Sequence, residues 1–370
     1  MRESIKLLFP PPKSSSTKVR NLPMAAAASS KTPLVPGHVE EKQAALFADL
    51  PPYSDPTTGF VSWLPRSWIP YAQLMRLERP AGLYAFYFPY LIGLMYAACI
   101  SPAAPEPLVV LQLAAIFLPM NILLRGAACC WNDTVDQDFD RQVERCRHRP
   151  VARGAVSTAS AHVFTLALLA AIYPILNLFP SGCKLHMAIS VVLFFVYALM
   201  KRVTYYPQVF LGFPFAWAIF FCAAALDVDP FGVYAAPTSA LFAANVLWTI
   251  IYDTIYAHQD VKDDEKAGVK SMALRFRNST KFLASSLAVV MVALLTLCGV
   301  WTGSGTLYYV GTVGGVAAAM SWYIYSVDLG DPQSCGAWFH DQFWIVGGAL
   351  MAGFTAEYLC RAADEMARRW

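Results

Sequence analysis

A succession of long apolar stretches constrains this chain more than any other feature. From residue 80 onward, nine stretches are each about long enough to cross a bilayer as a helix. They cover residues 80–100, 108–130, 160–179, 184–200, 207–226, 238–257, 282–302, 306–327 and 341–360. Only 14% of the 370 residues are charged, against about 25% in soluble domains. The sequence therefore predicts an all-α, multi-pass membrane protein.

The amino-terminal part has a different composition. Residues 1–60 are rich in Pro, Ser and Ala and contain no long apolar run, so they cannot bury enough surface to fold alone. Basic residues outnumber acids through residue 39, as in a mitochondrial transit peptide, but the prolines interrupt an amphipathic helix. We therefore expect a disordered or weakly structured tail over 1–67, on the cytosolic side, and a membrane domain over 68–370.

The loops differ in their content of basic residues, and this difference predicts how the spans are oriented in the membrane. The loops after the second, fourth and sixth spans carry many Arg and Lys residues, whereas the loops on the other side carry almost none. The positive-inside rule assigns the basic loops to the cytoplasmic side. Arg125 lies inside the second span, and we expect it to face the protein interior.

An acidic cluster follows the second span. It contains Asn132, Asp133, Asp136, Asp138 and Asp140. On a helix, Asn132, Asp136 and Asp140 share one face because they are spaced four residues apart. Oxygen ligands in this arrangement suit Mg²⁺, although a solvated acidic helix face is the alternative.

A second acidic cluster ends the sixth span, on the same side of the membrane. Asp253, Tyr256, Asp260 and Asp264 fall on one helical face. Divalent cations between the two clusters would neutralise their repulsion and favour a polyanionic ligand. The basic side chains nearby would hold its remaining oxygens. A diphosphate attached to an isoprenoid chain fits such a site at the membrane.

Metal ions that draw charge from the diphosphate would help an allylic C–O bond to ionise. Aromatic rings could stabilise the resulting cation, and the candidates are Phe86, Tyr87, Tyr205, Phe213, Phe215 and Trp217. A transporter or cation-binding protein is the rival class. Its ionisable groups usually lie at midplane, whereas both clusters here lie at span ends on one side.

Two other features argue against nucleic acid binding and against a zinc site. A net charge of +3 gives no case for nucleic acid binding. The cysteines are scattered, mostly within apolar runs, and lack the spacing of a zinc site. We expect them to be small buried hydrophobic residues, and they are Cys99, Cys129, Cys130, Cys146, Cys183, Cys222, Cys298, Cys335 and Cys360.

Over residues 68–360 the sequence resembles the UbiA superfamily of intramembrane prenyltransferases. Four segments carry the resemblance in the family's order. The first resembles the opening of the first helix, the second and fourth are Asp motifs, and the third resembles the central segment. They are Arg76 to Pro80; Asn132-Asp133-x-x-Asp136-x-x-x-Asp140, continuing to Gly154; Lys201 to Gly212; and Tyr252-Asp253-Thr254-x-Tyr256-Ala257, continuing to Ser271.

The resemblance implies about nine helices around a central cavity, with Mg²⁺ and the prenyl diphosphate held by the two Asp motifs. It assigns metal binding to Asn132, Asp136, Asp140, Asp260 and Asp264. It assigns catalytic or positioning roles to Asp133, Asp253 and Tyr256. Contacts to the diphosphate or to the acceptor carboxylate are expected from Arg79, Arg141, Arg149, Lys201, Arg202 and Lys262. Asp138 and Asp263 lie off the best faces and are expected to be solvated or to support the ligands.

Within the superfamily, the segments Cys130 to Asp133 and Arg147 to Ser157 resemble the fungal meroterpenoid branch more than the 4-hydroxybenzoate branch. The expected reaction is transfer of a farnesyl-length chain to a phenolic, polyketide-derived aromatic acid. The ubiquinone-pathway 4-hydroxybenzoate polyprenyltransferase is the alternative. We expect residence in the endomembranes (ER or Golgi) rather than the mitochondrial inner membrane, and no obligate protein partner.

Overall fold

The computed structural model describes residues 52–369, and every regular element in that range is helical. Most of the expected tail lies outside the described residues, including the basic segment that resembles a transit peptide. Its described part contains a short 3₁₀ helix, η1 (Phe60–Trp63), which packs against α2 (Ile69–Leu74). The domain boundary between residues 67 and 68 stays a prediction.

Each of the nine expected spans corresponds to helix in the structure. The first seven are α3 (Ala81–Ile100), α4 (Pro107–Val135), α6 (Thr158–Leu176), α7 (Gly182–Val203), α8 with α9 (Pro207–Ala216 and Ala218–Ala225), α10 (Ala235–Ala257) and α13 (Thr280–Thr302). The eighth comprises α14 (Thr306–Tyr308), a π-helical turn η3 (Tyr309–Gly314) and α15 (Gly315–Ser326). The ninth comprises α16 (Pro332–Gln342), a second π-helical turn η4 (Phe343–Gly347) and α17 (Gly348–Arg369).

Among residues 52–369, eight helical segments are long and apolar enough to cross a membrane. The eighth expected span is not among them; it is helical from Thr306 to Ser326, with the π-helical turn η3 in its middle. The expectation of a multi-pass, all-α membrane protein is therefore confirmed, and the last span is longer than expected because helix begins at Pro332 rather than near residue 341.

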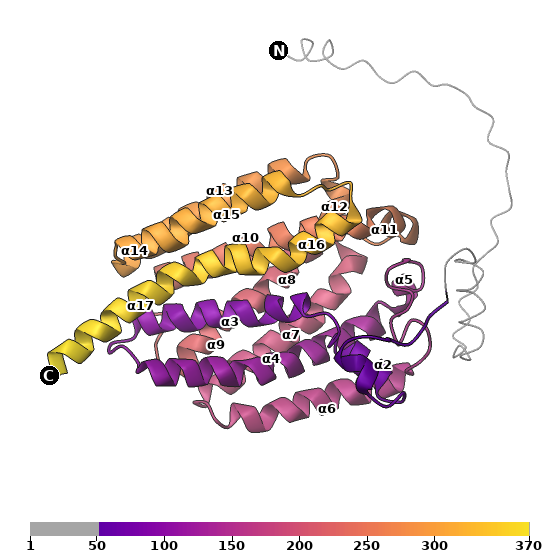
Figure 1. Ribbon diagram of the computed structural model, residues 1–370, viewed down its shortest axis with the longest axis horizontal. Helices are drawn as coiled ribbons and strands as arrows, with labels where there is room; N and C mark the ends of the chain where they lie inside the picture. Colours follow the sequence, from indigo (N-terminus) through magenta and orange to yellow (C-terminus); the bar gives the residue numbers. More distant parts are fainter. Residues whose placement is uncertain (1–51, 370) are drawn as a thin grey trace, which may run out of the picture. The chain divides into compact units, whose positions relative to one another are not determined.

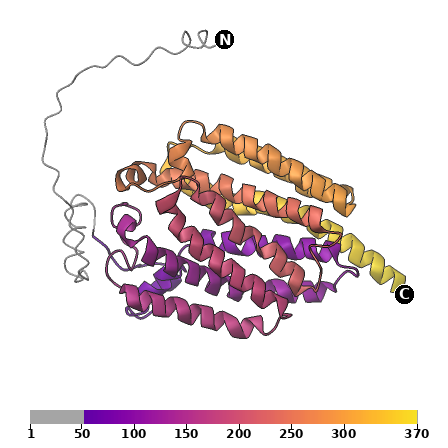
Figure 2. The ribbon, with the colours of Figure 1, turned by 180° about the vertical axis from the view of Figure 1, so that it is seen from behind.

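The apolar helices divide into a buried group and an outer group. In the span Ala81–Ile100, 72% of the residues in its 18-residue apolar window are buried, whereas in Thr158–Leu176 the share is 28%. Helix α3 is surrounded by α4, α9 and α17, and α6 packs on the outer side of α4, as Figures 1 and 2 show. The outer helices present exposed Leu, Val and Phe side chains, as expected of surfaces that face lipid.

Glycines let the central helices approach closely. A Cβ atom on Gly93 of α3 would lie 3.0 Å from the Cα of Ile219 in α9. On Gly212 of α8 it would lie 3.0 Å from the Cα of Val246 in α10. Small residues at helix crossings are typical of membrane bundles, in which close backbone packing drives association. Three of these helices, α3, α8 and α10, also line the cavity described below.

All nine cysteines are free, and six of them are buried. Cys99 and Cys129 are partly exposed, and Cys360 is exposed. The expectation that most of them are small core residues is confirmed.

Candidate active site

The first acidic cluster lies where α4 gives way to α5 (Gln137–Asp140). We expected a continuous helix, but the chain is interrupted at Asp136, which has φ −90° and ψ 4°. The spacing survives the interruption. The backbone N–H of Asp136 donates to the carbonyl of Asn132 at 2.8 Å, and that of Asp140 donates to the carbonyl of Asp136 at 2.9 Å. Asn132, Asp136 and Asp140 therefore stay neighbours.

The second cluster follows a similar interruption. Helix α10 ends at Ala257, and the chain continues through the 3₁₀ turn η2 (His258–Asp260) into α11 (Val261–Ala267). Both clusters lie at the end of the bundle where α2, α5, α11 and α12 (Met272–Arg275) gather (Figure 1). They line one cavity of about 170 Å³, which we call the polar cavity. Its acidic and amide side chains are Asn132, Asp136, Asp140, Gln208, Asp253, Asp260 and Asp264.

Basic side chains pair with three of these carboxylates, those of Asp136, Asp140 and Asp260. The Nζ of Lys201, on α7, lies 2.7 Å from Oδ2 of Asp136. The Nη1 of Arg149 lies 2.8 Å from both oxygens of Asp140. Burial raises the pKa of Asp140 to about 6, and the charge of Arg149 opposes this shift. The carboxylates therefore need cations to stay ionised at this depth.

Arg145 binds two residues of the second acidic cluster, Asp260 and Tyr256. Its Nε lies 2.9 Å from Oδ1 of Asp260, and its Nη2 donates to Oδ2 of the same carboxylate. Its Nη1 donates to the hydroxyl of Tyr256 at 3.0 Å. A planar guanidinium suits this two-oxygen contact, which fixes Asp260 and Tyr256 relative to each other.

The polar cavity fits an ion that is completed by a phosphate ligand. Within residues 52–369, no three His, Cys, Asp or Glu side chains converge closely enough to hold a metal ion by themselves. However, Oδ1 of Asp136 is buried and has no hydrogen-bond partner among the described residues. Mg²⁺ is usually bound through one or two carboxylates together with substrate phosphates and water. The donor set of amide and carboxylate oxygens matches that chemistry.

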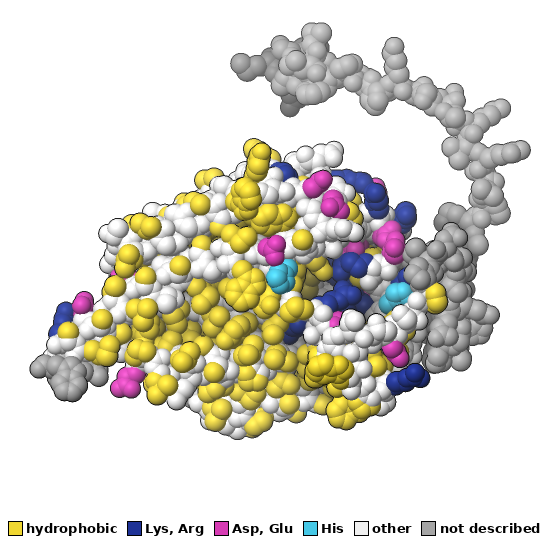
Figure 3. Space-filling model, in the orientation of Figure 1, with side chains coloured by type: hydrophobic (Ala, Val, Ile, Leu, Met, Phe, Trp, Pro, Cys, Tyr) yellow, Lys and Arg dark blue, Asp and Glu magenta, His cyan; other side chains and the backbone are white. Residues whose placement is uncertain are grey.

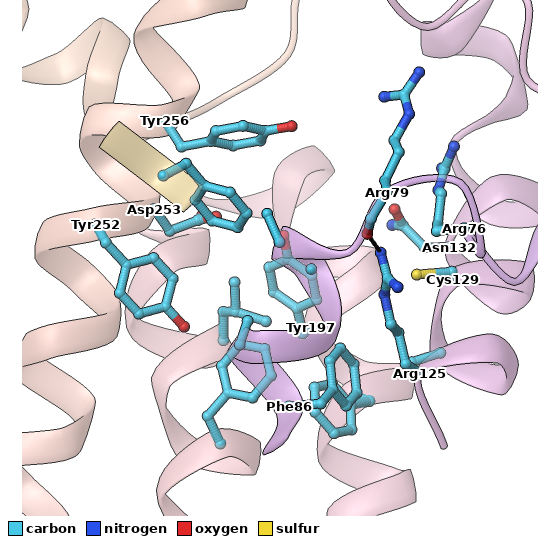
Figure 4. A pocket seen from close by; sticks show the side chains of 18 of the residues that line it. Arg76, Arg79, Phe86, Arg125, Cys129, Asn132, Tyr197, Tyr252, Asp253 and Tyr256 are labelled. Atoms are coloured by element: carbon cyan, nitrogen blue, oxygen red, sulfur yellow. Dashed lines mark hydrogen bonds between the residues drawn. The ribbon is translucent and has the colours of Figure 1, made fainter. Parts of the chain in front are cut away.

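The polar cavity adjoins a larger, mostly apolar one of about 380 Å³, which we call the inner cavity. Figure 4 shows Tyr252, Asp253 and Tyr256 on one wall, with Arg125 and Asn132 on the opposite wall. The residues that line both cavities are Asn132, Arg145, Arg149, Tyr197, Asp253 and Tyr256. A ligand with an anionic head and an apolar body can therefore span the two.

Aromatic rings enclose the inner cavity. Phe86 and Phe194 stack with centroids 4.8 Å apart, and Phe215 meets both rings edge-on. Of the six aromatic candidates from the sequence, Phe86 and Phe215 line this cavity. Tyr205 and Phe213 are exposed, and the hydroxyl of Tyr87 donates to the carbonyl of Ala114.

The model of the UbiA prenyltransferase family matches residues 86–347, which is more than half of the chain. The chain belongs to this family. The prenyltransferase ascA of Acremonium egyptiacum is 45% identical over 78% of this chain and 82% of its own length. The DMOA farnesyltransferase nvfB of Aspergillus novofumigatus is 33% identical, over 78% of this chain and 92% of its own.

Two further comparisons bear on the branch and the fold. The mitochondrial 4-hydroxybenzoate polyprenyltransferase of Saccharomyces cerevisiae is 38% identical, over 76% of this chain and 74% of its own. A UbiA homologue from Archaeoglobus fulgidus, solved with GPP and Mg²⁺, is 18% identical with a TM-score of 0.56, covering 80% and 99% of the two chains. The fold is thus that of the UbiA family, and the protein is an integral membrane prenyltransferase.

Three residues that the family motifs predicted as substrate contacts lie outside both cavities. The guanidinium of Arg141 contacts Gln137, Asp138 and the carbonyl of Ala152. Arg202 lies over the ring of Phe139 and donates to a backbone carbonyl. Lys262 is exposed. None of the three is among the residues that line the polar or inner cavity, and their substrate contacts stay predictions.

The remaining predicted residues lie at or behind the cavities. Arg79 lines the inner cavity. Asp133 is fully buried, accepts from Arg76 and lies 3.6 Å from Nη1 of Arg149, so it positions these arginines. Asp138 is 69% exposed, as expected. Asp263 accepts from the backbone N–H of Glu144 at 3.1 Å, which ties α11 to the loop after the first cluster.

Sequence reasoning did not assign Arg76, Arg145 and Tyr197, all of which line the inner cavity. A signal existed for Tyr197, which precedes Lys201 by four residues on α7 and so shares its helical face. Arg145 and Arg149 have the same spacing but lie in a segment of turns. The expectation that Arg125 faces the interior is confirmed, because it is 5% exposed and donates to the carbonyl of Arg79.

Proposed function

We propose that this protein transfers a farnesyl group from its allylic diphosphate to an aromatic carbon of a phenolic, polyketide-derived acid, in a Mg²⁺-dependent reaction of meroterpenoid biosynthesis. The observation that carries the proposal is the direct junction of the polar and inner cavities through shared residues. The relative ascA supports the branch, and nvfB, named a farnesyltransferase, supports the donor.

The two cavities have different roles, and the polar cavity binds the metal ions and the diphosphate. Asn132, Asp136, Asp140, Asp260 and Asp264 would hold Mg²⁺, which when bound supplies charge that stabilises the departing diphosphate. Lys201 and Arg149 remain beside those carboxylates and bind diphosphate oxygens.

The inner cavity takes the apolar chain and the acceptor. Its aromatic rings exclude water from the allylic cation and stabilise its charge. Asp253 and Tyr256 lie on the wall between the two cavities, where they orient the phenol. Arg79 is available to the acceptor carboxylate at the cavity boundary.

A direct assay tests the proposal. Membranes that contain the protein are incubated with Mg²⁺, farnesyl diphosphate and either 2,4-dihydroxybenzoate or related phenolic acids. Diphosphate release together with a farnesylated product in the mass spectrum is expected. No transfer to any phenolic acid, with any allylic donor, would overturn the proposal.

The second candidate is 4-hydroxybenzoate polyprenyl transfer for ubiquinone biosynthesis, which the 38% identity to the yeast enzyme favours. Faster transfer of a long polyprenyl chain to 4-hydroxybenzoate than of farnesyl to 2,4-dihydroxybenzoate would select it. The transporter alternative has no support, because the family consists of prenyltransferases.

We also infer an endomembrane location, in the ER or Golgi, from the likeness to the meroterpenoid relatives. A fluorescent fusion that colocalises with an ER or Golgi marker would agree with it. Colocalisation with a mitochondrial inner-membrane marker would instead match the alternative function.

A further inference from the structure

A third cavity of about 350 Å³ lies against the inner cavity, at the end of the bundle that holds the acidic clusters. We call it the antechamber. Segments 52–54, 73–79 and 145–150 contribute to its lining. The four arginines of its lining also line the inner cavity, so they form the boundary between the two spaces. They are Arg76, Arg79, Arg145 and Arg149. Figure 3 shows Lys and Arg side chains gathering in a hollow toward this end.

The roof of the antechamber is held in place by specific contacts. The guanidinium of Arg153 lies over the ring of Tyr53, 3.8 Å from its centroid. The side chain of Gln73 donates to the hydroxyl of Tyr53 at 3.1 Å and accepts from Arg153 at 2.9 Å. The ring of His148 lies 5.7 Å from that of Tyr53. These contacts fix the side chains of Tyr53, Gln73 and His148 on one side of the antechamber.

Within the described part of the chain, three of the four boundary arginines have close carboxylate partners and the fourth has a more distant one. Arg76 pairs with Asp133, Arg145 with Asp260, and Arg149 with Asp140. Among residues 52–369, the ion pair of Arg79 is with its neighbour Glu78, at 3.6 Å, and the side chain of Arg79 is half-exposed. A small anion at the boundary can therefore bind the guanidinium of Arg79 without displacing a close carboxylate partner.

We propose that the antechamber is the entry route and first binding subsite of the anionic aromatic acceptor, which passes from the cytosolic side into the inner cavity along Arg79. The proposal rests on the proposed function. Its polar and basic lining suits a carboxylate and disfavours a long apolar chain, so the prenyl donor reaches the inner cavity separately. Released diphosphate is the other small anion with matching chemistry, and the experiments below separate the two.

Ser54 offers a charge test away from the catalytic residues, because it lines the antechamber and neither of the other two cavities. Ser54→Glu places an anion in the route, and Ser54→Gln is the matched neutral control of similar size. With 2,4-dihydroxybenzoate as acceptor, we expect Ser54→Glu to raise KM about fivefold over Ser54→Gln. The effect should shrink in high salt because salt screens exposed charges.

Further comparisons in the same assay identify which anion uses the route. The KM for farnesyl diphosphate and the KM for resorcinol, a neutral acceptor, should be the same in both variants. Equal KM values of the two variants for 2,4-dihydroxybenzoate would overturn the proposal. A change confined to product inhibition by inorganic diphosphate would also overturn it, because the route would then serve product exit.

A labelling experiment tests the subsite without requiring turnover, so its failure is distinguishable from failure of the proposed function. In Ser54→Cys, the anionic reagent sulfonatoethyl methanethiosulfonate should modify the new thiol faster than the cationic trimethylammonioethyl reagent. Added 2,4-dihydroxybenzoate should slow modification, whereas resorcinol should not. Thr57→Cys, an exposed position that does not line the antechamber, is the control. The same charge preference and protection at both positions would overturn the proposal.

Discussion

The ammonium group of Lys201 lies 2.7 Å from Oδ2 of Asp136, joining the end of α7 to the end of α4. The other carboxylate oxygen, Oδ1, is buried and has no hydrogen-bond partner in the part of the chain that the structure describes. Arg149 and Arg145 hold Asp140 and Asp260 in the same way. Each of these three carboxylates is therefore paired with a basic side chain of the protein itself. We expect divalent cations to take over that role, leaving the basic groups beside the diphosphate.

Removal of a carboxylate from either cluster should abolish prenyl transfer. Asp136→Ala and Asp260→Ala each remove an expected metal ligand, and we expect turnover to fall by at least about 100-fold. Asp138→Ala is the matched control because its side chain is 69% exposed, and it should stay within about twofold of wild type. Diphosphate release is measured alongside membrane insertion of each variant. Equal loss in Asp138→Ala would show that the ligand face has been misassigned.

Lys201→Met should destabilise the metal-free protein, because it leaves the buried carboxylate of Asp136 uncompensated. Breaking a buried ion pair in this way costs about 3–5 kcal/mol. Thermal unfolding in detergent should show a lower Tm than wild type in the presence of EDTA. Mg²⁺ with inorganic diphosphate should recover part of the difference, since a bound cation supplies the missing positive charge. A Tm deficit that Mg²⁺ and diphosphate leave unchanged would argue against a metal at Asp136.

Arg145→Gln should impair turnover more than Arg141→Gln. Arg145 holds both Asp260 and Tyr256, so its loss misplaces a metal ligand and a residue of the cavity wall. We expect kcat/KM for the donor to fall about tenfold or more, since charge-assisted contacts contribute about 1.5–3 kcal/mol. Arg141 contacts the polypeptide outside the cavities, and its variant should retain most activity. The reverse order of severity would contradict the placement of these two arginines.

Close helix packing at Gly212 predicts a stability difference between two glycine substitutions. A Cβ atom there would lie 2.8 Å from Cγ1 and 3.0 Å from Cα of Val246. Gly212→Ala should therefore lower stability by about 1–3 kcal/mol as α8 and α10 move apart. A Cβ atom at Gly348 meets no neighbour within 4 Å, so Gly348→Ala should be neutral or stabilising. Thermal unfolding of the two variants compares them, and equal destabilisation would exclude close packing as the cause.

Several parts of the fold and site could be predicted from local sequence. Helical spans were predictable because hydropathy over some twenty residues reports on membrane insertion directly. The metal-ligand candidates were predictable because Asn132, Asp136 and Asp140 repeat every four residues, and this spacing survives the break at Asp136. The π-helical turns η3 and η4 carry no comparable signal, because they change the backbone hydrogen bonds without changing the apolar character of the span.

Other assignments required the tertiary structure. Arg141 and Arg145 belong to the same basic loop, yet Arg145 reaches Asp260, more than a hundred residues away, whereas Arg141 turns back to Gln137. Only the packing of α4, α7 and α10 decides which side chains meet in the polar cavity and which lie outside it. The sequence by itself determined the helices, the two acidic clusters and their common side of the membrane, because those depend on local spacing and charge. The tertiary structure decided the partner of each carboxylate, the junction of the two cavities and the antechamber, because contacts between distant segments depend on how the helices pack.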